Sequence, residues 1–308
     1  MKRTLVLGTI VFFGALTAAV LTAEQAAPAG GQGRGGGGGF PPIAPIEKVA
    51  GNLYMVTGEG GNTAVYVAAN GVVLVDTKLA NNGQAILDQV RKVTDKPITH
   101  IVNTHTHGDH TGSNQFFPAT VEIVVQENTA ANMQKMPVFQ DAANKNGLAD
   151  TTFKDKKTLL GGKDAIDLYH FGPAHTNGDT FIVFRDTKVM HSGDAFANKG
   201  QGLVDTNNGG SGVAYSDTIT KAGRTIKDVT TVIPGHAPLM TWQDFLDYGE
   251  FQRLFLAHAR ESMKAGRTAE EAMKTFMLPE KFKGYNLGGG RGGAAGNFGV
   301  IYAELQKK

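Results

Sequence analysis

A cluster of metal-binding side chains directly after an apolar run restricts what this chain can fold into. His105, His107, Asp109 and His110 fall within six residues, straight after residues 98–102. The apolar run predicts a β-strand, and a strand that ends in such a cluster places it on a loop at the edge of a sheet. Imidazoles and a carboxylate gathered there suit one or two small cations. A surface tract or an expression tag would lack the interleaved glycine and aspartate, so we predict a metal site.

Three later positions carry a histidine or an aspartate on a glycine-containing turn at the end of a predicted strand. They are His175, Asp194 and His236. The strands that precede them are predicted at residues 165–171, 188–192 and 229–233. Loops at strand ends are where a scaffold holds its functional groups. We therefore treat these three residues as candidates for the same site as the first cluster.

Strands and helices alternate along the chain, which is typical of an α/β sandwich. Apolar runs predict further strands at residues 52–56, 63–67, 72–76, 98–102, 121–125 and 180–184. Residues 82–93 have helical spacing, and Pro97 stops that helix. Asp76 ends the third of these strands. It is either an ordinary turn residue or a carboxylate that orients a neighbouring imidazole.

The pattern becomes helical over residues 241–308. Threonine and an acid have capping-box spacing at residues 241–244 and 268–271, and a short helix is expected around residues 298–305. We expect this extension to pack on the preceding domain, because it shows no second core of its own. Three glycine-rich segments are either walls of the pocket or solvated loops: residues 58–61, 200–212 and 288–296.

The first 45 residues differ in composition from the rest. Residues 1–23 have a basic start, an apolar middle and small residues near the end, which predicts a secretory signal peptide. A retained membrane anchor is the alternative, because about 17 apolar residues approach the length of a spanning helix. Residues 24–45 are rich in glycine and proline and predict a flexible linker. We expect the domain at residues 46–240 to be periplasmic or secreted, with membrane contact only through the N-terminal segment.

Composition excludes several kinds of chemistry. The chain has no cysteine, which rules out disulfides, thiolate ligands and a cysteine nucleophile. The formal net charge is only +2, which gives no reason to expect a nucleic-acid partner. The expected partner is therefore a small-molecule substrate.

Together these motifs resemble the metallo-β-lactamase superfamily over roughly residues 46–240. The resemblance rests on the H-x-H-x-D-H pattern and on the three later positions in their order. It implies an α/β fold, the αβ/βα four-layer sandwich, with the metal site at one edge between two sheets and here with extra C-terminal helices. It implies two Zn²⁺ ions, with iron or manganese as alternatives. By similarity, His105, His107 and His175 hold one ion, Asp109, His110 and His236 hold the other, and Asp194 bridges them.

The resemblance also implies hydrolysis by a metal-bridging hydroxide, with Asp109 passing a proton to the leaving group. The expected substrate is a β-lactam, a lactone, an ester or a thioester. Export favours a β-lactamase, whereas Asp194 stands where those enzymes usually carry cysteine or serine and is typical of glyoxalase II and lactonases. The alternatives are a glyoxalase-II-like thioesterase, a mononuclear-iron sulfur dioxygenase and, less favoured, a non-enzymatic metal-binding module.

Overall fold

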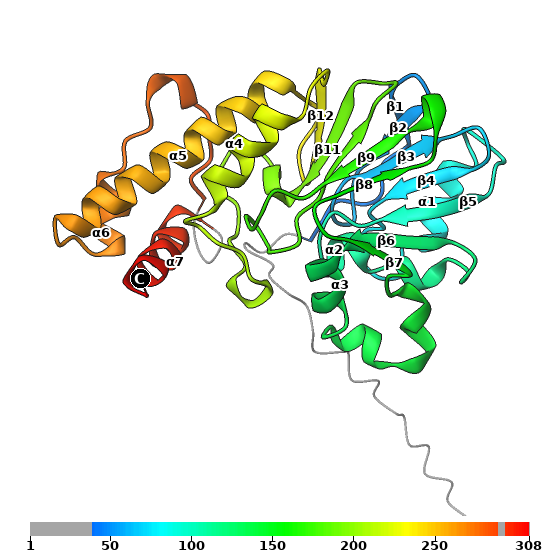
Figure 1. Ribbon diagram of the computed structural model, residues 1–308, viewed down its shortest axis with the longest axis horizontal. Helices are drawn as coiled ribbons and strands as arrows, with labels where there is room; N and C mark the ends of the chain where they lie inside the picture. Colours follow the sequence, from blue (N-terminus) through cyan, green and yellow to red (C-terminus); the bar gives the residue numbers. More distant parts are fainter. Residues whose placement is uncertain (1–38, 289–292, 308) are drawn as a thin grey trace, which may run out of the picture. The chain divides into compact units, whose positions relative to one another are not determined.

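Two β-sheets lie against each other with helices outside them, as Figure 1 shows for the computed structural model. The structure describes residues 39–288 and 293–307. The predicted α/β four-layer sandwich with extra C-terminal helices is confirmed. The predicted signal peptide and most of the predicted linker lie outside the described residues. Within the described part of the chain, no helix is both long enough and apolar enough to cross a bilayer.

The first sheet has seven strands whose spatial order follows the chain. β1 to β4 pair antiparallel, and β4 to β7 pair parallel. The carboxyl ends of β4, β5 and β6 therefore open at the same edge of the sheet. The strands are β1 (Glu47–Ala50), β2 (Leu53–Val56), β3 (Thr63–Val67), β4 (Val72–Val75), β5 (Ile98–Val102), β6 (Glu122–Gln126) and β7 (Thr151–Phe153).

The second sheet has six strands in the order β13-β12-β11-β10-β9-β8. Only β11 and β12 pair parallel, so their carboxyl ends also lie at a common edge. The strands are β8 (Lys156–Leu159), β9 (Ile166–Tyr169), β10 (Phe181–Phe184), β11 (Val189–Gly193), β12 (Thr231–Pro234) and β13 (Met240–Thr241).

The main core lies between the sheets. Tyr66 and Val73 of the first sheet join Ile182 and Phe184 of the second in one buried cluster. The rings of Tyr66 and Phe184 have centroids 5.3 Å apart. Because successive strand side chains alternate between faces, neighbours such as Leu74 point the other way, into a cluster under the outer helices. Burial on both faces explains why these strands read as uniformly apolar runs.

Helices cover both sheets and continue into the C-terminal extension. The helices are α1 (Gly83–Val90), α2 (Gly108–Thr111), α3 (Glu127–Met133), α4 (Tyr215–Thr225), α5 (Trp242–Lys264), α6 (Ala269–Thr275) and α7 (Ala294–Gln306). Single 3-10 turns lie at Asn114–Phe116, Pro137–Gln140, Ala142–Gly147, Gly162–Asp164, Asp194–Phe196, Thr206–Asn208 and Glu280–Phe282. Capping boxes begin α5 at Thr241 and α6 at Thr268, as the sequence predicts. Phe245 and Phe251 of α5 pack on the second sheet, and Phe255 stacks on Phe298 of α7.

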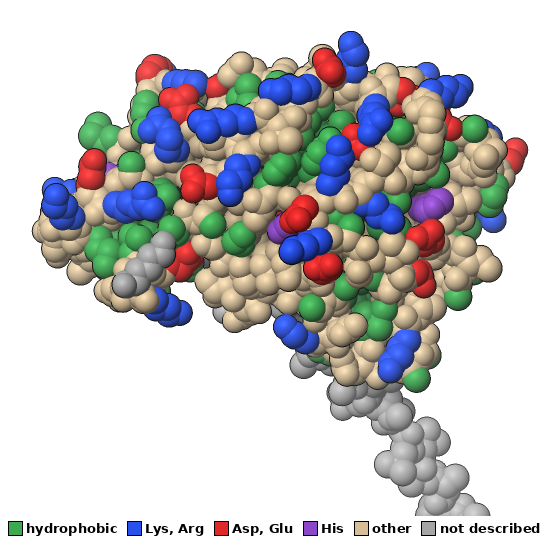
Figure 2. All heavy atoms as spheres, in the orientation of Figure 1, with side chains coloured by type: hydrophobic (Ala, Val, Ile, Leu, Met, Phe, Trp, Pro, Cys, Tyr) green, Lys and Arg blue, Asp and Glu red, His purple; other side chains and the backbone are tan. Residues whose placement is uncertain are grey.

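Some elements were not predicted from the sequence. β7 and β8 are short edge strands, and each buries one apolar side chain, Phe153 or Leu159. A single buried side chain does not produce the alternating apolar pattern by which a strand is recognised in a sequence. α4 was missed because its sequence is rich in threonine and other polar residues, although its buried face packs closely on α5. Figure 2 shows basic and acidic side chains interspersed over the face in view.

The last part of the predicted linker packs on the domain. The carbonyl oxygen of Pro41 accepts a hydrogen bond from Glu59 N at 2.7 Å, and Ala44 N donates to Thr57 O at 3.0 Å. These bonds tie the segment to the β2–β3 loop. Glycine and proline content alone did not reveal them, because the partners are main-chain atoms far along the chain.

Replacing Phe184 with alanine should reduce the free energy of unfolding by about 3–5 kcal/mol, because a fully buried aromatic ring leaves a cavity between the sheets. Met277→Ala is the control. Its side chain is 86% exposed, and we expect a change within about 0.5 kcal/mol. Urea unfolding of both variants measures the difference, and equal losses would contradict this description of the core.

Candidate metal centre

The seven predicted site residues meet at the edge where the parallel strands end. The loop after β5 and the short helix α2 carry the first four, the turn after β9 carries His175, and the ends of β11 and β12 carry Asp194 and His236. Their possible ligand atoms form two groups, and within each group these atoms lie within 4.8 Å of one another. The first group is His105, His107, His175 and Asp194, and the second is Asp109, His110 and His236.

Hydrogen bonds fix which ring nitrogen of His107 and His175 faces the centre. The Nε2 atom of His107 lies 2.6 Å from Asp205 Oδ2, and the Nδ1 atom of His175 lies 2.7 Å from Leu203 O. Both partners only accept, so these nitrogens carry the protons. The remaining nitrogens, His107 Nδ1 and His175 Nε2, are 3.0 Å apart and present lone pairs to each other.

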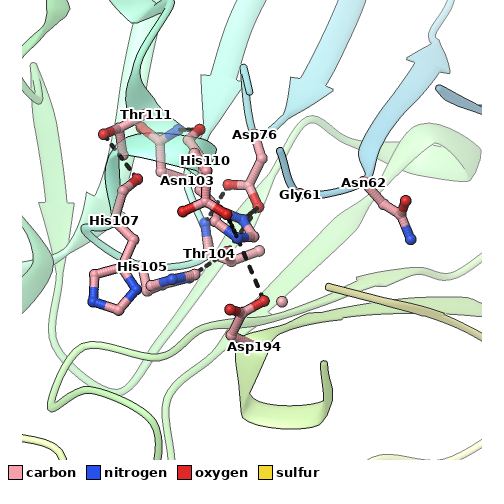
Figure 3. Close-up of polar contacts among 12 residues, drawn as sticks. Gly61, Asn62, Asp76, Asn103, Thr104, His105, His107, His110, Thr111 and Asp194 are labelled. Atoms are coloured by element: carbon pink, nitrogen blue, oxygen red, sulfur yellow. Dashed lines mark hydrogen bonds and ion pairs between the residues drawn. The ribbon is translucent and has the colours of Figure 1, made fainter. Parts of the chain in front are cut away.

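Asp76 orients two more imidazoles of the cluster, those of His105 and His110 (Figure 3). Its Oδ2 accepts from His110 Nδ1 at 2.7 Å and from Thr104 Oγ1 at 2.8 Å. Because the Thr104 hydroxyl donates to Asp76, its oxygen accepts from His105 Nδ1, 3.0 Å away. The Nε2 atom of His105 therefore directs a lone pair at the centre, and the Nε2 atom of His110 is turned toward the same place. Of the two alternatives for Asp76, the structure supports the orienting carboxylate.

Asp194 lies between the two groups. Its Oδ1 is 3.4 Å from His110 Nε2 and 3.2 Å from His236 Nε2, and its Oδ2 is 3.7 Å from His175 Nε2. One carboxylate oxygen thus faces each group. The Oδ2 atom of Asp109 completes the second group, 3.2 Å from His236 Nε2 and 3.6 Å from His110 Nε2.

Two glycines allow the strand ends to approach the cluster. Gly193 has a φ of +50°, and a Cβ there would overlap the side chain of Thr104. A Cβ on Gly235 would overlap Asp194 Oδ1. Any larger residue at either place would push Asp194 or Thr104 out of position. Glycine at these turns is therefore required by the close packing of the site.

The carboxylates and imidazoles shift each other's pKa strongly. Burial alone would lower the pKa of His236, but Asp194 and Asp109 outweigh it and raise that pKa to about 9. The same carboxylates raise the pKa of His110 well above its ordinary value, against the effect of burial. Burial would raise the pKa of Asp109, but His110 and His236 lower it to about 2.

In the first group, burial outweighs the effect of the nearby carboxylates on the histidine pKa values. Burial, reinforced by the neighbouring His110 and His175, holds the pKa of His105 well below its usual range. Burial also lowers the pKa of His175. These rings are neutral at physiological pH and offer lone pairs, which is the form that binds a metal ion.

The donor set fits divalent metal ions. The buried Nε2 of His105 and Oδ1 of Asp194 have no hydrogen-bond partner among the described residues. Lone pairs of His107 and His175 face each other across 3.0 Å, which repels without a cation between them. Buried polar atoms left unpaired in this way are costly, and a cation would satisfy them.

Asp205 was not predicted from the sequence. It lies in the glycine-rich segment that follows β11, 98 residues beyond its partner His107, and its side chain is largely buried. The bond to His107 overcomes the effect of burial and lowers the pKa of Asp205. A single aspartate after a glycine-rich stretch carries no local signal of such a role, because the contact exists only in the folded chain.

Lys78 is a second buried group that the sequence did not reveal. Its Nζ donates to Val56 O and Gly61 O, each at 2.9 Å, and the residue is fully buried. Burial lowers the pKa of this amine to about 7, even though Asp76 and Glu59 act to raise it. Lys78 thereby holds the β2–β3 loop, whose Gly61 N donates to Asp109 O at 3.0 Å.

The four remaining histidines have structural partners. His191 is buried and donates to Asn62 O, and His170 donates to Asp179 O. His100 contacts the hydroxyl of Thr99. His258 contacts Ala272 O from its place in α5.

Comparison with known sequences decides the family. The sequence profile of the Metallo-beta-lactamase superfamily matches residues 56–236, more than half of the chain. The chain belongs to this superfamily. It is 26% identical over 161 residues to the metallo-beta-lactamase type 2 of Elizabethkingia meningoseptica, which covers 49% of this chain and 62% of that protein. Three curated relatives, this one included, are matched over 62 to 66% of their own length.

Solved structures show the same superfamily fold. The DIM-1 metallo-beta-lactamase superposes with a TM-score of 0.59 at 20% identity, covering 70% of this chain and 98% of that one. The sec-alkylsulfatase Pisa1 of Pseudomonas sp. superposes with a TM-score of 0.70 at 16% identity, covering 85% of this chain and 50% of that one. At these identities the likeness concerns the fold alone.

Replacing Asp205 with alanine should weaken binding of one metal ion about 10–100-fold, because a ligand that loses its carboxylate partner loses orientation and basicity. Asp205→Asn keeps the size and shape of the side chain and should reduce the metal affinity less than Asp205→Ala does. Competition with a chromogenic chelator measures the two affinities. Unchanged zinc affinity in Asp205→Ala would show that His107 does not depend on this contact.

Metal binding at pH 7 should release about one proton or more per chain, because the metal must displace the proton that His236 holds with a pKa of about 9. The apparent zinc affinity should therefore rise as pH increases toward that pKa. Calorimetry in two buffers of different ionisation enthalpy measures the release. A heat that does not depend on the buffer would contradict this charge balance.

Proposed function

We propose that this chain is an exported dinuclear zinc hydrolase that cleaves a carbonyl substrate: a β-lactam, lactone, ester or thioester. The observation that carries the proposal is the pair of ligand groups on either side of Asp194, with one of its oxygens toward each group. A site for a single ion would not need the second group. Membership of the superfamily supports hydrolysis as the reaction class.

In the proposed site the three histidines of the first group would hold one zinc ion, and Asp109, His110 and His236 would hold the other. Asp194, with one oxygen toward each group, would be shared between them. Bound zinc would supply an acidified water molecule and an electrophile for the substrate carbonyl. Asp76 and Asp205 keep the imidazoles in the tautomers that direct lone pairs inward.

Asp109 is the proposed proton carrier. Its carboxylate is largely buried at the centre, and the adjacent His110 and His236 hold its pKa at about 2 against the effect of burial. It is therefore ionised at neutral pH, and the proposed role needs this carboxylate form. The main chain of Asp109 is tied to Gly61, so the side chain starts from a fixed point.

Relatives and site chemistry favour different substrates within this class. The Elizabethkingia relative is named a metallo-beta-lactamase, which supports a β-lactam. Asp194 stands at the position where cysteine or serine is expected in a β-lactamase. An aspartate there supports a lactone or a thioester substrate, as in a glyoxalase-II-like enzyme.

Elemental analysis and a substrate panel test the proposal together. We expect two zinc ions per chain, and turnover of at least one among a chromogenic cephalosporin, a lactone, an ester and a thioester. A single iron ion would favour the sulfur dioxygenase alternative. Two bound metal ions without turnover of any of these compounds would favour the metal-binding module.

Asp109→Asn should reduce turnover of the substrate found in that panel at least about 100-fold, as loss of a proton carrier does. Asp95→Asn is the matched control, because Asp95 is an exposed aspartate on the surface. Steady-state kinetics on both zinc-loaded variants separates kcat from KM. Equal activity of the Asp109→Asn and Asp95→Asn enzymes would remove Asp109 from the mechanism.

Export is part of the same proposal and is tested separately. Residues 1–23 have the composition of a signal peptide, so we propose a periplasmic or secreted enzyme. Cell fractionation with mass spectrometry of the recovered protein should find a chain shortened near residue 23 or 26 outside the cytoplasm. A full-length chain in the membrane fraction would favour the uncleaved anchor.

A further inference from the structure

We infer that the C-terminal helix α7 sets the geometry of the first metal position by holding the loop that orients His107 and His175. We call residues 201–213 the orienting loop. The inference rests on the proposed function, because it assumes that these two histidines bind a metal ion. It assigns a role to residues that lie outside the part of the chain matched by the superfamily profile.

The orienting loop supplies both partners that select the tautomers of these histidines. Leu203 O accepts from His175 Nδ1, and Asp205 Oδ2 accepts from His107 Nε2. The main chain of the loop also contacts the ligand turn directly, because Asp205 N donates to His175 O at 2.9 Å. A shift of this loop would therefore disturb two ligands at once.

Asn297 of α7 holds the loop on both sides of Leu203. Its Nδ2 donates to Gly202 O at 2.6 Å, and its Oδ1 accepts from Val204 N at 3.4 Å. The side chain amide thus pairs with one carbonyl and one N–H group of the loop. Asn297 is only 1% exposed, so water does not readily replace it.

Glu304, two turns further along α7, holds the other end of the orienting loop. Its carboxylate accepts from Ser211 Oγ at 2.5 Å and from Gly212 N at 2.8 Å. Val213 N lies 3.4 Å from the same carboxylate. Five polar groups of the orienting loop, at its two ends, therefore have α7 side chains as partners at 2.5 to 3.4 Å.

The contacts of α7 with the loop are distinct from its packing on the rest of the extension. Phe298 stacks on Phe255 of α5 with ring centroids 4.1 Å apart, and this contact has no part in the loop. Phe298 is fully buried, as Asn297 nearly is. The two neighbours therefore provide a matched pair in which one variant weakens helix packing and the other removes the hydrogen bonds to the loop.

A zinc titration of the full chain tests the inference. Asn297→Ala should weaken the first metal position about 3–10-fold, less than loss of a direct ligand partner, and should leave the second nearly unchanged. Phe298→Leu should lower the melting temperature about as much as Asn297→Ala does. Unlike Asn297→Ala, it should retain both zinc affinities. Cobalt titrated in place of zinc reports the same change through its visible absorption, independently of turnover.

The double variant Asn297→Ala, Asp205→Ala locates the effect. If α7 acts through the orienting loop, Asp205→Ala should reduce zinc affinity less in the Asn297→Ala background than in the wild-type chain. The two effects are then not additive, because both substitutions act on the same histidine. Equal zinc binding by Asn297→Ala and wild type, or equal weakening by Phe298→Leu, would overturn the inference. A wild-type chain that binds no metal would instead reject the proposed function.

Discussion

The carboxylate of Asp76 is the group on which the ligand geometry depends. It is fully buried at the end of β4, and its main-chain N–H donates to Val102 O, which pairs it with the end of β5. Three hydrogen bonds from Thr104 and His110 satisfy it. A buried charge without such partners would be strongly unfavourable. Parallel pairing of two strands thus fixes one carboxylate, which in turn fixes two imidazoles.

The cluster is arranged for positive charge. The carboxylates of Asp109 and Asp194 draw protons onto His110 and His236, against the effect of burial. A proton supplies this positive charge less effectively than a metal ion, because each proton binds to only one lone pair. A divalent cation satisfies several lone pairs together, including the unpaired Nε2 of His105. The same imbalance that raises these pKa values therefore favours a metal ion over protons.

Sequence reasoning located the candidate ligands because their signal is local. The spacing of His105, His107 and His110 and the strands around them are visible within a short window. His175, Asp194 and His236 each follow a predicted strand. Parallel pairing brings the ends of β11 and β12 together, and β9, which runs in the same direction as β11 because β10 lies antiparallel between them, ends at the same edge. The fold class follows from the same alternation of strands and helices. These features depend on residues that are neighbours in the chain.

The groups that orient the ligands could not be found in this way. Asp205 lies 98 residues from His107, and Asn297 lies 95 residues from Gly202. Lys78 resembles any surface lysine until the β2–β3 loop closes over it. Such contacts have no period and no motif, because each joins one side chain to one distant atom. Only the packed chain shows them.

The family core and the flanking segments make different contributions to the site. All seven candidate ligands lie within residues 56–236, the part shared with the superfamily. Asn297 and Glu304 lie beyond it, and so does Phe40, whose ring stacks on His236 with centroids 5.7 Å apart. The shared core therefore provides the candidate donor atoms, and segments before and after the matched range adjoin the site. Because they contact the ligands and their orienting loop, differences in these segments can change metal geometry and access without changing a single ligand.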